Sequence, residues 1–191
     1  MRQRLTRICL CLLAMLLTPV LACGAAESSL TEIDGGGMRA GEFVWRPELS
    51  PSGPMSMVIN LRSQRAYVYR DSVLIGISTI SSGKPGHSTP TGTFTVTEKD
   101  RVHHSNKYDN APMPYMERLT SGGVALHGGH LPGYPASHGC IRLPIAFAAA
   151  LFREPTMGMT VIITNRRPGE ENTTVSSNAT TRARTHEAVS T

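Results

Sequence analysis

The N-terminal segment lacks acidic residues and lacks an apolar run long enough to cross a bilayer. Residues 1 to 7, MRQRLTR, carry three arginines, and the apolar run ICLCLLAMLL that follows is shorter than the roughly 20 residues that a spanning helix needs. The small residues of TPVLAC close the segment. A basic start, a short apolar stretch and a small-residue exit are typical of a cleaved secretory signal peptide, here residues 1–22. A retained N-terminal anchor is the alternative interpretation.

The expected folded region lacks a second cysteine that could pair with Cys140. Of the four cysteines, Cys9 and Cys11 lie in the signal segment and Cys23 directly follows it. The sequence VLAC at 20–23 resembles a bacterial lipoprotein box, so Cys23 is a candidate for lipidation and membrane anchoring, with plain secretion as the alternative. A disulfide within the folded region is excluded. Because a lone thiol in an exported protein is exposed to oxidation and mispairing, chemistry is favoured over packing for Cys140.

The exported chain also lacks the positive charge and the aromatic platform of a nucleic-acid-binding protein. The formal net charge of the sequence is +5, and it falls to +2 once Arg2, Arg4 and Arg7 are removed with the signal peptide. Aromatic residues make up only 5% of the chain, and no basic stripe is present. We therefore expect no nucleic-acid partner.

Polar, turn-rich composition marks both ends of the exported chain, and no internal repeat is present. Residues 23–53 contain DGGG and SPSGP and are expected to form a linker. Residues 166–191 are rich in serine, threonine, asparagine and mixed charge. Such a segment has too little apolar surface to offset the entropy cost of ordering, so we expect a disordered tail. One compact domain over residues 54–165 remains.

Short β-type runs separated by turn residues dominate this domain. Segments 57–61 and 65–70 flank a polar turn and predict a hairpin. Further strands are predicted at 73–80, 93–97, 124–127 and 159–164. The alanine-rich segment 144–152 starts on a proline and predicts a single helix. The pattern indicates a mainly β sandwich or barrel with one helix after Cys140.

The segment HGGHLPGYPASHGCIRLP at 127–144 places three of the chain's seven histidines beside Cys140. Cysteine acyl-transfer chemistry needs a thiol, a base and donors for an oxyanion. His127, at the end of a predicted strand, can act as the base, and the glycine-rich backbone can supply donors. The dipole of the following helix is expected to favour the thiolate modestly. Two other interpretations stay open: a zinc site made from His127, His130, His138 and Cys140, and a small buried cysteine beside a core histidine.

Four sequence blocks, in order, carry a resemblance to a known family. SHGCIR at 137–142 and LHGG at 126–129 resemble the signature of bacterial L,D-transpeptidases. SSGKPGHSTPTGTFTV at 81–96 is similar to a preceding segment of that family, and APMPYMERLTSGGVALHG at 111–128 resembles the approach to its first histidine. The resemblance covers essentially residues 57–164. It implies the family's mostly β catalytic domain, in agreement with the strand pattern.

The resemblance also implies roles for individual residues. Family members use the cysteine of SHGC as nucleophile, here Cys140, and the upstream histidine as base, here His127. The carbonyl of Gly128 is expected to orient the imidazole, and Arg142 is expected to hold a substrate carboxylate through its planar fork of donors. The residues expected to line the site and help form the oxyanion hole are His138, Gly139 and Tyr115.

The remaining histidines and one lysine have weaker assignments. Lys84 and His87 lie in a turn-rich loop and are expected to be solvated rather than catalytic. His103 and His104 lie in a polar stretch that we expect to be a loop. This loop is a candidate lid over the site. The role of His130 is left open.

The reaction that the resemblance implies is two-step acyl transfer on peptidoglycan stem peptides in the periplasm or cell envelope. Cys140 attacks the carbonyl of the third stem residue, commonly diaminopimelate, and D-alanine leaves. An amine of a neighbouring stem then takes the acyl group and forms a 3→3 cross-link, and no metal or organic cofactor is implied. The alternatives are an L,D-carboxypeptidase that gives the same acyl group to water, a His/Cys zinc hydrolase, and a wall-binding module without catalysis.

Overall fold

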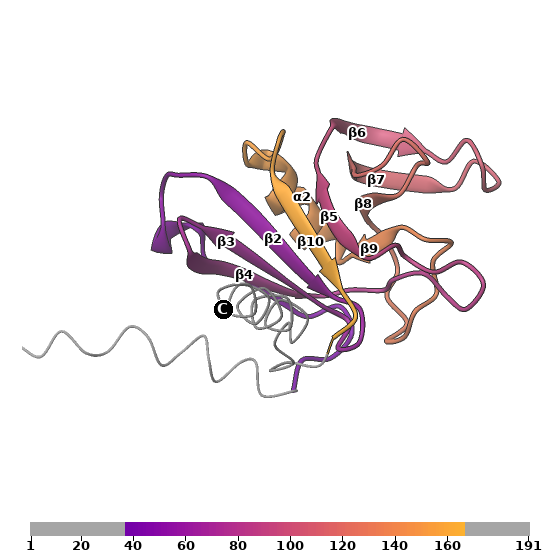
Figure 1. The fold of residues 1–191 in the computed structure, drawn as a ribbon, viewed down its shortest axis with the longest axis horizontal. Coiled ribbons are helices and arrows are strands. Elements are labelled where there is room, and N and C mark those ends of the chain that lie inside the picture. The colour runs from indigo at the N-terminus through magenta and orange to yellow at the C-terminus, as the bar shows by residue number, and fades with distance from the viewer. Residues whose placement is uncertain (1–36, 167–191) are drawn as a thin grey trace, which may run out of the picture.

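A computed structural model describes residues 37–166, which form two β-sheets and one α-helix (Figure 1). The signal peptide at 1–22, the lipidation candidate Cys23 and all but the first residue of the expected tail at 166–191 lie outside the described residues. No helix within residues 37–166 is long and apolar enough to cross a membrane. The elements in chain order are β1 Phe43–Trp45, the 3-10 turn η1 Pro47–Leu49, β2 Met55–Asn60, β3 Arg65–Arg70, β4 Val73–Thr79, β5 Gly92–Thr95, β6 Glu98–His104, β7 Pro112–Arg118, β8 Ala125–Gly128, β9 Ile141–Leu143, α2 Ile145–Arg153 and β10 Thr160–Thr164.

The larger sheet has the strand order β1-β4-β3-β2-β10-β5. β2 and β3 form the predicted antiparallel hairpin, with Met57 opposite Val68. β10 pairs in parallel with β2 and antiparallel with β5, so the last strand of the domain lies between β2 and the edge strand β5. Between β5 and β6 the chain crosses from the larger sheet to the smaller sheet (Figure 1).

The smaller sheet has the order β6-β7-β8-β9, with β8 and β9 parallel to each other. Helix α2 packs against β7 and β8 and also reaches β1 of the larger sheet. The predicted mainly β fold with one helix after Cys140 is confirmed for the described residues.

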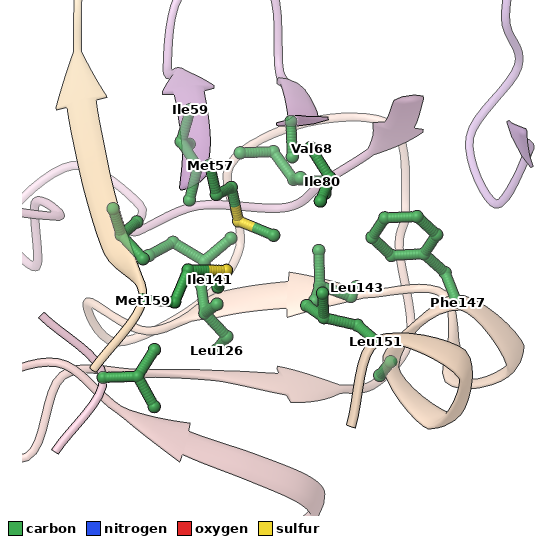
Figure 2. Close-up of a cluster of buried hydrophobic side chains, with 14 of the residues drawn as sticks. Met57, Ile59, Val68, Ile80, Leu126, Ile141, Leu143, Phe147, Leu151 and Met159 are labelled. Carbon is green, nitrogen blue, oxygen red and sulfur yellow. The ribbon is translucent and has the colours of Figure 1, made fainter. Parts of the chain in front are cut away.

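The core fills the space between the two sheets and the helix (Figure 2). Alternate residues of β2 and β3 point inward, because successive side chains of a strand project to opposite faces. Leu126 of β8 and Ile141 of β9 meet them from the smaller sheet, and Phe147 and Leu151 of α2 close one side. β8 and β9 are therefore held rigidly at the centre of the domain.

Part of the expected linker at 23–53 packs on the domain. β1 pairs with β4, and the Trp45 ring lies edge-on to Phe147, with the ring centroids 5.4 Å apart. A Cβ on Gly76 would lie 2.7 Å from the Trp45 ring, so the glycine leaves the space that the indole fills. A strand of three residues is too short to show an alternating pattern, which is why the sequence did not predict it.

His103 and His104, expected to lie in a loop, belong to strand β6, so this expectation was wrong. β6 is an edge strand of mainly exposed, charged residues, EKDRVHH, and its partner β7 contains Pro112 and Pro114. Charged edges and prolines discourage sheet-to-sheet association, and they also remove the apolar alternation that predicts a strand. The structure places His103, but not His104, in the wall of the cleft described below.

A buried ion pair fixes β6 and β7 to the end of helix α2. The Lys99 ammonium donates to the carbonyl oxygens of Phe152 and Glu154, each at 2.8 Å, and lies 3.6 Å from Oε1 of Glu117. Thr156 donates to the same Glu117 oxygen at 2.6 Å. Only 1% of the Glu117 side chain is exposed, and burial raises the pKa of its carboxyl group despite the contacts with Thr156 and Lys99. This pair sets the position of β7, which forms one wall of the cleft.

Replacing Lys99 with methionine is expected to lower the free energy of unfolding by about 3 kcal/mol, because it leaves the buried Glu117 carboxylate without its cation. The pKa of Glu117 is already raised in the folded state and rises further in this variant. The stability that this carboxyl group contributes is present below its unfolded-state pKa and is lost as pH rises. The destabilisation caused by Lys99→Met should therefore be larger at pH 8 than at pH 5. Urea unfolding at the two pH values measures both effects.

The double variant Lys99→Met/Glu117→Leu is the matched control. It replaces both charges with apolar side chains of similar size, and it should recover most of the lost stability. If the double variant is as unstable as Lys99→Met, the unpaired carboxylate is not the cause.

Candidate active site

A cleft of about 670 Å³ lies against the smaller sheet, and both Cys140 and His127 line it. Its walls come from the β6–β7 loop, β7, the turn after β7, β8, and the segment that leads into β9. The structure thus brings the predicted nucleophile and base to one cavity.

The strand register explains why the two side chains share this cavity. In the parallel β8–β9 pair, Leu126 lies opposite Ile141 and His127 lies opposite Arg142. Leu126 and Ile141 are both in the core, so the next residue along each strand projects to the opposite face. Cys140 precedes Ile141 and therefore shares that face with His127 and Arg142. The core pattern alone directs the thiol and the imidazole to the same side of the sheet.

His127 is held by its neighbour in the chain. Its Nδ1 lies 2.9 Å from the carbonyl oxygen of Gly128, which can only accept, so Nδ1 carries the hydrogen and Nε2 of the neutral ring has a free lone pair. The His127 side chain is buried, and burial lowers its pKa, with a further lowering by the positive charge of Arg142. A neutral imidazole with an unprotonated Nε2 is the form that can accept a proton near neutral pH.

The Cys140 thiol lies against the turn between β7 and β8. Its Sγ donates to the carbonyl oxygen of Gly123 at 3.5 Å, and its side chain packs beside Met113 and Met116 of β7. Burial raises the pKa of the thiol, although a hydrogen bond from the Ala125 backbone and the charge of Arg142 partly oppose the rise. Desolvation therefore outweighs the contributions that favour the thiolate. Burial thus favours the neutral form of both the thiol and the imidazole.

The turn that presents Cys140 is built by one serine. The Ser137 hydroxyl donates to the carbonyl oxygen of Cys140 at 2.5 Å and accepts from the backbone N–H of Gly139 at 3.1 Å. Gly139 has a φ of +114°, a conformation that other residues rarely adopt. Thr89 donates to the carbonyl oxygen of Gly139 at 2.9 Å. The carbonyl oxygens of Gly139 and Cys140 and the N–H of Gly139 are therefore each fixed by a specific partner.

The segment that begins SSGK supports this turn from outside. Ser81 and Arg142 form a backbone bridge, and the backbone N–H of Lys84 donates to the carbonyl oxygen of Ser137 at 3.0 Å. A Cβ on Gly83 would lie 2.0 Å from the carbonyl oxygen of His87, so only glycine fits there. Two sequence blocks more than fifty residues apart thus form one unit around the thiol.

The comparison with protein families agrees with this geometry. Residues 54–163 match the family model YkuD, described as the L,D-transpeptidase catalytic domain. The chain belongs to this L,D-transpeptidase family. None of the curated proteins compared with it matches.

Solved L,D-transpeptidases share its fold. The structure from Stackebrandtia nassauensis is 24% identical with a TM-score of 0.55 and covers 62% of this chain and 58% of its own. An enzyme from Xylanimonas cellulosilytica is 28% identical with a TM-score of 0.54, covering 59% of this chain and 61% of its own. An L,D-transpeptidase in complex with imipenem is 27% identical with a TM-score of 0.52, covering 58% of each chain. This chain spans less than two thirds of the length of these relatives.

Most of the residues expected at the site of this L,D-transpeptidase domain line the cleft. Gly128, His138 and Arg142 do so together with Cys140 and His127. The Arg142 side chain lies over Gly129, where a Cβ would be 3.4 Å from its Cγ and Cδ. The same cleft holds His130, which is exposed. Gly139 is buried and does not line the cleft, and its backbone N–H, expected to serve the oxyanion, donates to the Ser137 hydroxyl oxygen.

Tyr115 does not reach the site, contrary to expectation. Its φ is +57°, and this irregularity turns its side chain to the other face of β7, where its ring contacts Phe152 of α2 at 5.8 Å between centroids. Met113 and Met116, on either side of it in the strand, both face Cys140 instead. An alternating strand would place these two methionines on opposite faces. The assignment of Tyr115 came from the resemblance and did not take this irregularity of β7 into account.

Three cleft residues of the L,D-transpeptidase domain were missed in the sequence. Tyr108, in the β6–β7 loop, stacks on His138 with a centroid distance of 4.4 Å, and His87 lies edge-on to the same histidine at 4.7 Å. His87, expected to be solvated, is exposed but packs in this cluster. The two others are Lys107 and Arg118. Tyr108 and Lys107 lie outside the quoted blocks, and Arg118 lies within the block 111–128, but a loop position and a strand end carry no periodic signal that would mark them as cleft residues.

The zinc interpretation gains no support from the structure. Within residues 37–166, no group of three or more His, Cys, Asp or Glu side chains is placed to hold a metal ion. His127 is bound to the Gly128 carbonyl, and His138 is stacked on Tyr108 at the rim. The histidines that cluster in the sequence thus have different partners in the fold.

Proposed function

We propose that this chain is a peptidoglycan L,D-transpeptidase that forms 3→3 cross-links through a thioester on Cys140. The observation that carries the proposal is the shared face of β8 and β9, which places the thiol and the His127 imidazole in one cleft of an L,D-transpeptidase domain. Such a family acts on the stem peptides of the cell wall, and both the donor and the acceptor stem are the proposed partners.

In the first step, Cys140 attacks the carbonyl carbon of the third stem residue. Nε2 of His127 takes the thiol proton as the C–S bond forms, and the negative charge that develops on the carbonyl oxygen is stabilised by donors in the cleft. The tetrahedral intermediate collapses, the C–N bond to D-alanine breaks, and the imidazolium returns the proton to the leaving amine. The product of this step is the thioester and free D-alanine.

In the second step, an amine of a neighbouring stem attacks the thioester carbonyl. His127 accepts a proton from the amine, and the thiol leaves protonated, so the starting state of the pair is restored. If water takes the place of the amine, the same thioester yields a free tripeptide, which is the L,D-carboxypeptidase reaction. We propose that the reaction takes place in the periplasm or cell envelope, after removal of the signal peptide.

Muropeptide analysis tests the cross-linking proposal. The purified chain, incubated with disaccharide-tetrapeptides, should yield D-alanine and dimers with 3→3 linkages in the mass spectrum. Free tripeptides without dimers would contradict transpeptidation and favour the carboxypeptidase. Because a related L,D-transpeptidase is known in complex with imipenem, we also expect imipenem to add its mass to Cys140 in the wild type but not in a Cys140→Ala control.

Replacing Arg142 with alanine is expected to raise KM for the tetrapeptide donor about tenfold with a smaller loss in kcat, because the guanidinium is proposed to hold a substrate carboxylate. Arg142 also lowers the pKa of His127 by its charge. Its removal should therefore move the acid limb of the pH profile to higher pH. Steady-state kinetics from pH 5 to pH 8 measure both effects. Wild-type KM together with an unmoved acid limb would exclude this role.

A further inference from the structure

Two cations converge beside the nucleophile. The position that a Cβ would take on Gly123 lies 4.0 Å from Nη1 of Arg118 and 4.0 Å from Nζ of Lys107. The carbonyl oxygen of the same glycine accepts the Cys140 thiol at 3.5 Å. Gly123 has a φ of +95° and no side chain, so the space between the two cations and next to the thiol stays open. Lys107 comes from the β6–β7 loop and Arg118 from the end of β7, and the fold brings them to one point.

The charges of these two residues are only partly compensated by the protein. Arg118 pairs with Glu98 at 2.5 Å, whereas Lys107 donates to the uncharged carbonyl oxygen of Gly122 at 2.6 Å. None of the residues that line the cleft is Asp or Glu, and Arg142 adds a third cation to its wall. Like charges close together repel, and an anionic ligand between them removes that cost. The cleft is therefore suited to a negatively charged group beside the reacting carbonyl.

We propose that Lys107 and Arg118 bind a free carboxylate of the donor stem peptide, and that the enzyme selects donors in which this group is not amidated. The inference rests on the proposed function and specifies its substrate. A tetrapeptide stem with diaminopimelate at its third position offers two carboxylates close to the scissile bond: that of the terminal D-alanine and that of the diaminopimelate side chain. Both offer the same chemistry, a planar anion that an ammonium and a guanidinium can hold together.

The two cations also act on the thiol, and this effect must be separated from binding. Both Arg118 and Lys107 oppose the rise in the pKa of Cys140 through their charge. Loss of that effect would slow acylation by every donor by the same factor. Loss of a carboxylate contact slows only donors that carry the carboxylate. A comparison of donors therefore distinguishes the two roles.

The test uses the purified exported chain and three disaccharide-tetrapeptides: the free acid, its C-terminal amide and its side-chain amide at the third residue. Release of D-alanine or D-alanine amide gives kcat/KM for each. We expect the wild-type kcat/KM to be about tenfold or more higher for the free acid than for one of the two amides. Lys107→Gln and Arg118→Gln should each lower kcat/KM about tenfold for the free acid and less than twofold for that amide. The amide that loses activity identifies the carboxylate that is bound.

Arg101→Gln is the matched control, because Arg101 is an exposed cation of β6 that does not line the cleft. It should leave kcat/KM unchanged for all three donors. A wild type that uses all donors equally, or a Lys107→Gln variant that slows all of them by one factor, overturns the inference while the proposed function stands. A wild type inactive on every donor overturns the proposed function and this inference with it.

Discussion

Replacing Cys140 with alanine is expected to abolish thioester formation, and replacing it with serine is expected to lower kcat/KM at least about a thousandfold. Alanine removes the only atom that can form the acyl-enzyme. Serine keeps a nucleophilic atom, but its hydroxyl is a much weaker nucleophile than a thiol supported by one histidine. Mass spectrometry of the intact protein after incubation with tetrapeptide donors measures the adduct, and D-alanine release measures turnover.

The fold of the Cys140 variants should be unaffected. The turn around residue 140 is fixed by backbone bonds to Ser137 and Thr89 and not by the sulfur. Loss of the sulfur contacts with Met113 and Met116 should change the free energy of unfolding by no more than about 1 kcal/mol. A Cys140→Ala protein that unfolds at the wild-type urea concentration and still releases D-alanine would refute the assignment of the nucleophile.

The sequence pattern predicted those elements whose side chains meet the core in a regular order. The β2–β3 hairpin alternates over six residues in each strand, and α2 has a continuous apolar surface after a proline, so both were predicted close to their observed bounds. β6 could not be predicted, because an edge strand is stabilised by its backbone pairing to β7 and needs no apolar face. The three residues of β1 pack through a single tryptophan, which leaves no pattern to detect.

The functional residues divide in the same way. Cys140, His127 and Arg142 lie in the quoted motifs, so they were predicted as site residues, but β9 and its parallel pairing with β8, which put them on one face, were not predicted. Tyr115 required knowledge of a positive φ within β7, and Tyr108 and Lys107 required the path of the β6–β7 loop. Those depend on contacts between distant segments. The role of the SSGK segment was also hidden, because its hydrogen bonds to Ser137 join residues far apart in the chain.

Replacing His127 with glutamine is expected to lower kcat/KM about a thousandfold at pH 7 and to change the form of the pH profile. In the wild type, burial holds the pKa of His127 below its usual value of 6.5 and the pKa of the thiol above its usual value of 9.0. The active form is the neutral pair, so kcat/KM should fall in acid with a midpoint below pH 6.5. It should then be level from about pH 7 to pH 9.

Without the imidazole, attack depends on the small fraction of thiolate present in solution. In His127→Gln, kcat/KM should therefore rise about tenfold for each pH unit up to the raised pKa of Cys140, with no acid limb from histidine. A thiolate–imidazolium pair at rest would give a different profile, since activity would then require the imidazolium, and kcat/KM would fall at alkaline pH as that group loses its proton. His104→Gln, which changes an exposed histidine outside the cleft, is the control and should keep the wild-type profile. Because the prediction follows from burial of both groups, a wild-type profile that falls between about pH 7 and pH 9 would mean that the charged pair is stabilised in spite of that burial.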